Sequence, residues 1–261
     1  MIPLVPGRSS AMIILISAAF LIGAMLFLSR IRKMTPKVRK VAGLTAIEES
    51  IGRCTEMGRP IHYAVGRSSL TGPSAAETIA GLSLLGHVAK LSAQYGVRLI
   101  FTNQLPEVQP LAEDIVKQGF LAAGKPEIYN SQNVRFLSSF AMAYTSGAIG
   151  VMYREKIAAN FMLGGWYAES LTLAETGFNL GAIQVAGTTQ VAQLPFFATV
   201  CDYVLIGEEL LAAAAYVSED KVQLGSMVGQ DFVKVVAILL IALGAILRTL
   251  GVDALYNLFR L

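Results

Sequence analysis

The feature that most constrains this chain is a run of nineteen uncharged residues, Ala11–Ser29, followed directly by a strongly basic segment. A helix of about twenty apolar residues is long enough to cross the roughly 30 Å hydrocarbon core of a bilayer. The next eleven residues, Arg30–Lys40, include six basic residues and no acidic one. Because Lys and Arg beside a span stay on the cytoplasmic side, residues 1–40 are predicted to form an anchor in the cell membrane with a cytoplasmic body behind it.

A cleaved signal peptide is the alternative interpretation of this run. Signal peptides carry their positive charge before a shorter apolar core and a small-residue cleavage site after it. Here only Arg8 precedes the run, and the basic residues follow it. The order of the residues therefore favours an uncleaved anchor, whose basic segment is also able to contact anionic lipid head groups.

A second apolar stretch, Phe232–Leu250, lies near the end of the sequence. Its two basic residues, Lys234 and Arg248, are close to its ends, where long side chains can reach the membrane interface. We predict a C-terminal transmembrane helix and tail over residues 230–261, with a helix lying in the interface as the alternative. Residues 41–229 would then form a cytoplasmic domain that is tethered at both ends.

Within residues 41–229, short apolar runs alternate with longer segments of helical periodicity. The expected strands are Ile61–Val65, Val97–Thr102, Val134–Leu137, Ala182–Ala186 and Tyr203–Ile206. The expected helices are Leu44–Met57, Ser74–Tyr95, Glu107–Ala123, Ser139–Lys156, Ala158–Phe178, one that ends near Cys201, and Glu208–Ala215. This alternation is typical of a parallel sheet. The predicted fold class is α/β, a mainly parallel sheet with helices on both faces (Rossmann-like), flanked by N- and C-terminal transmembrane helices.

Two details of the helices follow from local patterns. Thr45 with Glu48, and Ser74 with Glu77, each match the capping box that opens a helix. The segment Ala158–Phe178 is apolar enough to suggest a further span, but it contains two glutamates, and a carboxylate at the bilayer centre is costly. We expect a core or interface helix there, with membrane contact as the alternative.

Candidate binding residues follow the predicted strands, since ligands of open α/β sheets bind beyond the carboxyl ends of the strands. Hydroxyls, backbone N–H groups at helix N-termini and one arginine suit a phosphate or a carboxylate. The candidate residues are Arg67, Ser68, Ser69, Thr71, Asn103, Thr188 and Thr189. The alternative is that these side chains only cap helices and complete turns.

Catalytic and metal-binding motifs are missing from the sequence. It contains no G-x-G-x-x-G, no phosphate-binding G-x-x-x-x-G-K-[ST], no G-x-S-x-G and no zinc-ligand spacing. His62 and His87 form no constellation, so each is expected to be a hydrogen-bonded or interface residue. We predict no catalytic residue, no metal site and no cofactor. Enzymatic activity therefore stays uncertain, and the sequence favours a protein that is not an enzyme.

Composition narrows the possible partners. The net charge is +3, and because six basic residues lie beside the first anchor, the body is near neutral, which argues against nucleic acid as a partner. Cys54 and Cys201 form no C-x-x-C pair and are expected to be buried free thiols in a reducing compartment. Only 15% of the residues are charged and 54% are hydrophobic, so the body is expected to bury more surface than a lone monomer would.

Three long segments are similar to a known family: AIEESIGRCTEMGRPIHY (46–63), ETIAGLSLLGHVAKLSAQYGVRLI (77–100) and QLPFFATVCDYVLIGEELLAAAAY (193–216). They resemble prokaryotic membrane proteins described only as a domain of unknown function (DUF6754-like). The resemblance covers about Gly43 to Gly229 together with the flanking anchors. It implies a membrane location and an α/β body, and it transfers no catalytic residues.

Two functions are compatible with these features. The first is a membrane-anchored structural or assembly protein, a scaffold that forms homo-oligomers or docks a membrane-protein partner through its cytoplasmic domain. The small-residue helices at 139–178 and the high apolar content favour it, because obligate interfaces are more apolar than ordinary surface. The alternative is a membrane-tethered binding or sensory module that holds an anionic or phosphorylated small molecule at the strand ends.

Overall fold

The computed structural model describes residues 41–72, 74–218 and 221–251, together with residues 16, 17, 19, 20 and 23. Contacts divide the chain into a compact unit, Arg39–Ser218, and a second unit made of Met1–Val38 and Glu219–Leu261. Apart from those five isolated residues, the predicted N-terminal anchor and its basic run lie outside the described residues.

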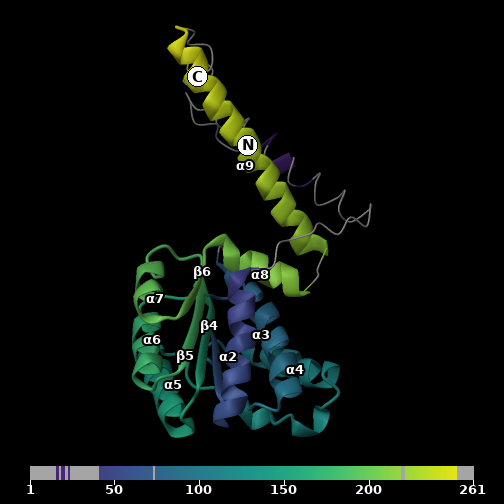
Figure 1. Ribbon diagram of the computed structural model, residues 1–261, viewed down its shortest axis with the longest axis vertical. Coiled ribbons are helices and arrows are strands. Elements are labelled where there is room, and N and C mark those ends of the chain that lie inside the picture. Colours follow the sequence, from purple (N-terminus) through teal and green to yellow (C-terminus); the bar gives the residue numbers. More distant parts are fainter. Residues whose placement is uncertain are drawn as a thin grey trace. The chain divides into compact units, whose positions relative to one another are not determined.

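The compact unit is built on one sheet of six parallel strands (Figure 1). The strands are β1 (Ile61–Gly66), β2 (Leu99–Asn103), β3 (Val134–Phe136), β4 (Ala159–Gly165), β5 (Ile183–Thr188) and β6 (Tyr203–Ile206). Their order across the sheet is β3-β2-β1-β4-β5-β6, which is the order of doubly wound dinucleotide-binding folds. The predicted α/β fold with a parallel sheet is confirmed.

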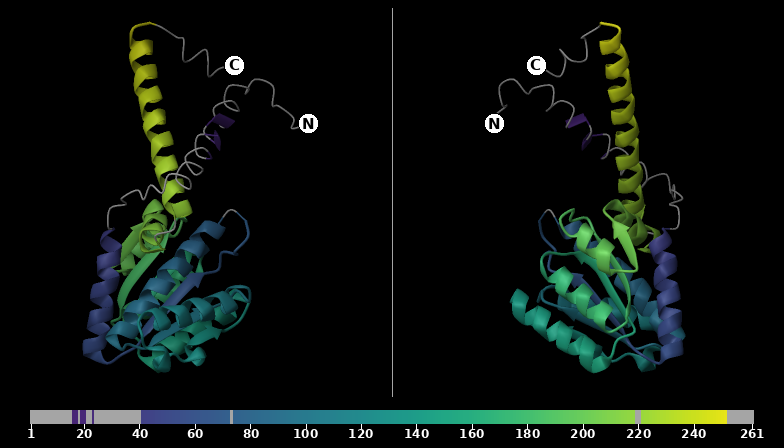
Figure 2. Two further views of the ribbon diagram at one scale, coloured as in Figure 1. Left: turned by 90° about the vertical axis from the view of Figure 1, so that its right-hand side faces the viewer. Right: turned by 60° about the vertical axis from the view of Figure 1, so that its left-hand side comes forward.

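Helices cover both faces of this sheet. One face packs against α2 (Ala42–Met57), α3 (Ala75–Tyr95), α4 (Val108–Ala122) and α8 (Glu208–Ser218); the other packs against α5 (Ala141–Glu155), α6 (Glu169–Asn179) and α7 (Leu194–Val200). Successive residues of β1, Tyr63 and Ala64, belong to different hydrophobic clusters, because strand side chains alternate between the faces. Both views of Figure 2 show α2 on the outside of the unit.

The central strand β4 corrects one prediction. The segment Ala158–Phe178, expected to be a single helix, consists of β4, a short turn and α6. Every residue of β4 is buried, so its sequence is apolar apart from Asn160 and shows no alternation, which periodicity alone cannot distinguish from a buried helix. The segment is too short in each part to span a membrane, and its two glutamates belong to α6.

The helix ends agree with the sequence better than the helix starts do. Helices α2 and α3 end at Gly58 and Gly96, which have φ of +61° and +71°, the left-handed conformation that glycine adopts most readily. The capping box predicted at Thr45 is wrong, and the one predicted at Ser74 is correct in its position but lacks the side-chain bond. Thr45 lies inside α2, and Ser74 occupies the N-cap of α3 without a side-chain cap bond.

A row of buried polar side chains crosses the sheet beneath α5 and α6. Asn160 Nδ2 donates to Gln184 Oε1 (2.9 Å), so Asn160 Oδ1 faces His62 and accepts from its Nδ1 (2.8 Å). His62 Nε2 then accepts from the Thr102 hydroxyl (2.8 Å), which lies 3.4 Å from the Tyr144 hydroxyl. At the far end, Gln184 Nε2 donates to two main-chain carbonyls of α6 and α7. His62 is therefore a hydrogen-bonded core residue, as predicted.

The second unit contains α9 (Lys221–Thr249). The stretch Gln223–Thr249 is 27 residues long and apolar enough to cross a membrane. Helix α9 begins before Phe232, where the predicted apolar stretch starts. The first turns of the helix are more polar, so a search for an apolar run does not detect them. It is the candidate span among the residues that the structure describes.

Candidate functional site

The carboxyl ends of β1 and β4 lie side by side where the strand order reverses, the usual ligand crevice of a doubly wound sheet. Here the main chain bridges the two ends, since the N–H of Arg67 donates to Gly165 O (2.9 Å). Gly66 has φ +79°, and a Cβ at this position would lie 2.1 Å from Gly165 O. Only glycine allows this approach.

Glu77 occupies the first turn of α3, the helix that follows β1. Its buried carboxylate accepts hydrogen bonds from the hydroxyls of Thr189 (2.5 Å) and Thr188 (3.3 Å), and from Gln190 Nε2 (2.8 Å). In doubly wound folds a bound phosphate sits at this helix N-terminus. The side chain of Glu77 supplies the negative charge instead. An anion bound here would meet a carboxylate, and the two threonine hydroxyls are already engaged.

The other predicted residues are spread along the same edge. Ser69 is half-buried and Thr71 is exposed; their hydroxyls bond to each other (3.1 Å), and the Ser69 hydroxyl also donates to Glu107 (3.2 Å). Asn103 Nδ2 donates to Gln109 Oε1 (2.6 Å), and Asn103 Oδ1 accepts from a backbone N–H in the loop that follows β2. The bonds within Ser69–Thr71 and from Asn103 Oδ1 complete turns, the alternative that the sequence left open, and those to Glu107 and Gln109 connect the loops to neighbouring residues of the same edge. Ligand binding by the predicted set stays a prediction.

Arg67 and Glu169 add opposite charges to this edge. The Arg67 guanidinium lies 5.4 Å from the centre of the Tyr167 ring, within the range of a cation–π contact. Glu169, in the first turn of α6, accepts from the N–H of Tyr167 (3.3 Å). Burial raises the pKa of Glu169, while hydrogen bonds from the backbone and the charge of Arg67 act in the other direction. Sequence reasoning missed Glu169 as a site residue because its segment was interpreted as one helix.

Three buried polar atoms at the strand ends have no hydrogen-bond partner among the described residues. They are Ser68 Oγ after β1, Gln104 Oε1 after β2 and Trp166 Nε1 after β4. A buried polar group without a partner costs about 1–3 kcal/mol, and few proteins retain many of them. The indole can only donate, the amide oxygen can only accept, and the hydroxyl can do both. Each of the three could therefore bind a polar group of a ligand.

Comparison with known proteins gives a family and no individual relative. Residues 6–259 match the family described as Domain of unknown function (DUF6754). No curated protein and no solved structure matches the chain. The match covers both the α/β unit and α9, and the family was anticipated from the three segments quoted above. The chain therefore belongs to the family described as Domain of unknown function (DUF6754).

Proposed function

We propose that this chain is a membrane-tethered assembly protein whose α/β unit self-associates through the outer face of α5, α6 and α7. The observation that carries the proposal is the scarcity of charge on this face. Of the fourteen exposed residues on these three helices, only Arg154 and Glu175 are charged. The fourteen exposed residues on α2 and α4 include five that are charged: Glu49, Arg53, Glu56, Asp114 and Lys117.

Large apolar side chains take the place of the missing charges. Phe140 and Met142, at the start of α5, are 81% and 82% exposed, and Phe178 at the end of α6 is 67% exposed. Aromatic residues and methionine are enriched at the cores of protein interfaces, whereas charged residues are depleted there. Helix α6 packs against both α5 and α7, so these side chains belong to one continuous layer. The exposed residues of this layer of three helices have the composition of a protein interface.

A second copy of the chain is the partner that fits this face. The face has one cation, Arg154, and one anion, Glu175, and in a two-fold symmetric contact each could pair with the opposite charge on the other copy. Tethering to a bilayer through α9 and the predicted N-terminal anchor would limit how each unit can turn, which reduces the entropy lost on lateral docking. We place the unit in the cytoplasm, supported by the basic run Arg30–Lys40.

The test is the mass of the full chain in mild non-ionic detergent, measured by light scattering during size-exclusion chromatography. We expect a dimer or larger assembly that the double substitution Phe140→Ser, Met142→Ser weakens at least tenfold. The matched control is Leu111→Ser with Leu121→Ser, which removes two exposed leucines from α4 and is expected to leave the assembly intact. A wild-type chain that stays monomeric at all concentrations would contradict the proposal.

A second candidate function, small-molecule binding at the strand ends, is favoured by the unpartnered atoms of Ser68, Gln104 and Trp166. The carboxylates of Glu77 and Glu169 favour a polar ligand with hydrogen-bond donors there over the anion predicted from the sequence. Thermal-shift screening of the full chain against amines, polyols, nucleotides and sugar phosphates tests this function. A stabilisation that Ser68→Ala abolishes would support it, and no response to any compound would contradict it.

A further inference from the structure

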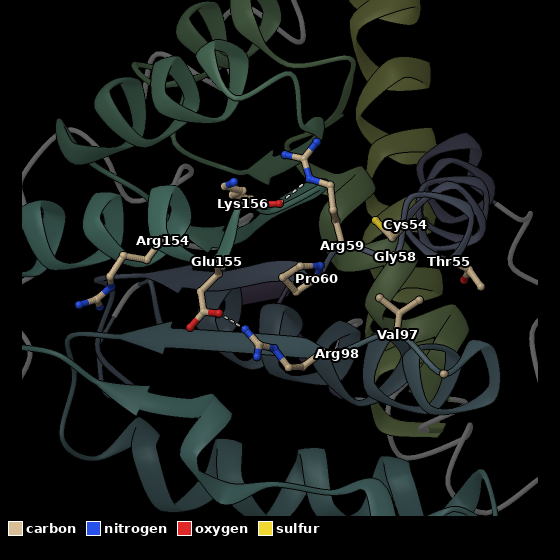
Figure 3. A pocket seen from close by; sticks show the side chains of 11 residues that line it. Cys54, Thr55, Gly58, Arg59, Pro60, Val97, Arg98, Arg154, Glu155 and Lys156 are labelled. Carbon is tan, nitrogen blue, oxygen red and sulfur yellow. Dashed lines mark hydrogen bonds and ion pairs between the residues drawn. The ribbon is translucent and has the colours of Figure 1, made fainter.

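A pocket of about 440 Å³ lies at the opposite edge of the sheet, where β1, β2 and β4 begin (Figure 3). Its size is within the range of small-molecule sites. The lining residues that carry charge are Arg59 before β1, Arg98 before β2, and Arg154, Glu155 and Lys156 at the end of α5. None of them belongs to the residues that the sequence predicted as a site, and none lies at the strand ends described above.

The charge of this pocket is positive. Four cationic side chains against one carboxylate give the lining a formal charge of +3. Three helices, α2, α3 and α5, end at this edge, and each C-terminus contributes at most about half a negative charge. Their sum of about −1.5 offsets half of the formal charge, and without Arg154 the lining still carries a formal charge of +2. Glu155 is moreover paired with Arg135 from outside the lining (3.0 Å), as well as with Arg98.

Two of the guanidinium groups are held in place by the protein. Arg59 donates from Nε to Lys156 O (2.5 Å) and from Nη2 to Ile157 O (2.8 Å), and Arg98 is held by Glu155. The two bonds of Arg59 use only two of the five N–H donors of a guanidinium. In Figure 3 the side chains of Arg59 and Arg98 lie on either side of Pro60, whereas Arg154 points away from them. The fixed donors are pre-organised for an anion.

Lys156, the third cation near Arg59 and Arg98, has a backbone conformation that is unfavourable for a residue with a side chain. It ends α5 with φ +50° and is the one non-glycine residue with positive φ in the described part of the chain. At the same edge, α2 and α3 end in glycine in the same left-handed conformation. A side chain in this conformation is strained, and such strain is concentrated at functional sites. Glycine would fit the backbone better, but it would remove a charge from the pocket.

We propose that this pocket binds a phosphate group, held by Arg59, Arg98 and Lys156. Guanidinium forks match phosphate oxygens in geometry, and lysine adds a compact point charge. The phosphate could belong to a soluble small molecule or to the head group of an anionic lipid. The pocket shares Arg154 with the charge-poor face of α5, α6 and α7, but the proposed phosphate ligands Arg59, Arg98 and Lys156 lie outside these helices. Self-association and phosphate binding can therefore succeed or fail independently.

The decisive variant is Lys156→Gly, tested in the full chain in non-ionic detergent. Because glycine relieves the strained backbone, this variant is expected to melt at a higher temperature than the wild type without ligand. It is also expected to bind pyrophosphate about tenfold more weakly in calorimetric titration, a loss that misfolding cannot explain. Lys117→Gln on α4, which removes an equal charge from an exposed site, is the control and should bind like the wild type.

Two arms of the experiment separate the sources of the phosphate. Binding of inorganic phosphate or pyrophosphate from solution indicates a soluble ligand. Binding only to nanodiscs that contain phosphatidate, and not to phosphatidylcholine nanodiscs, indicates a lipid head group. The proposal is overturned if neither arm shows binding, if Lys156→Gly binds like the wild type, or if Lys117→Gln weakens binding as much as Lys156→Gly does.

Discussion

Acidification is expected to destabilise the α/β unit through His62. This side chain is fully buried, and burial lowers its pKa from 6.5 to about 4, opposed in part by its hydrogen bond with Asn160. Between these two pH values the unfolded chain binds a proton that the folded chain does not, so stability falls as the pH falls. At 1.36 kcal/mol for each pH unit, the loss amounts to about 3 kcal/mol, and below pH 4 this group causes no further loss.

The fluorescence of Trp166 is a suitable assay, because it is the single tryptophan of the chain and is fully buried in the α/β unit. Thermal unfolding of the full chain in non-ionic detergent would be followed from pH 7.5 to pH 4. A loss of about 3 kcal/mol corresponds to a melting temperature roughly 6–12 °C lower for a unit of this size. Most of the decrease is expected between pH 6.5 and pH 4.5.

Carboxylates also titrate near the lower end of this range, so a variant without the imidazole is needed. His62→Gln should melt at a lower temperature than the wild type at pH 7.5, because the polar row is interrupted. Its melting temperature should however fall much less than that of the wild type between pH 6.5 and pH 5, because the raised pKa of Glu169 acts in the opposite direction to the lowered pKa of His62. Parallel pH profiles for the variant and the wild type would refute the assignment of this pH dependence to His62.

Three further outcomes are expected. Gly66→Ala should cost more than about 3 kcal/mol of unfolding free energy in urea titration, because its φ is +79° and its Cβ would lie 2.1 Å from a carbonyl oxygen; the control Gly52→Ala, whose Cβ meets nothing within 4 Å, should cost nothing. Glu77→Ala should cost about 3 kcal/mol in the same titration, because three donors lose their acceptor; an unchanged midpoint would contradict the role given to this carboxylate. Burial raises the pKa of Cys54 and of Cys201 to about 12, so iodoacetamide at pH 8 should modify the native chain at least a hundredfold more slowly than free cysteine, and faster modification of either thiol would show that it is accessible.

The local elements of this fold could be predicted where a residue type has one dominant conformational role. Gly58 and Gly96 mark helix ends, and the runs that begin at Ile61 and Tyr203 are strands at the predicted positions. The strand β4 was not recognised, because a short, fully buried run fits a buried helix as well as a strand unless turn residues bound it. The equally buried β1 lies between Pro60 and Gly66, whereas no Gly or Pro separates the start of β4 from Lys156. The order of the strands is likewise absent from local patterns, which do not determine which strands pair.

The candidate sites were predicted less well, because they depend on contacts between distant residues. Glu77 satisfied a local capping pattern with Ser74, but its partner Thr189 lies 112 positions further along the chain. The cationic pocket combines Arg59, Arg98 and Lys156, which come together only when three strands begin at the same edge. No spacing in the sequence relates these residues to one another.

The polar row through His62 also makes the alignment of the strands specific. Asn160 of β4 stands between His62 of β1 and Gln184 of β5, and a slip of β4 by one residue would bring the apolar side chain of Phe161 into its place. Strands β1, β4 and β5 would then each bury an imidazole or an amide that has lost a partner. An all-apolar sheet interior would tolerate such a slip more easily. The polar row therefore specifies the register in which β4 pairs with β1 and β5.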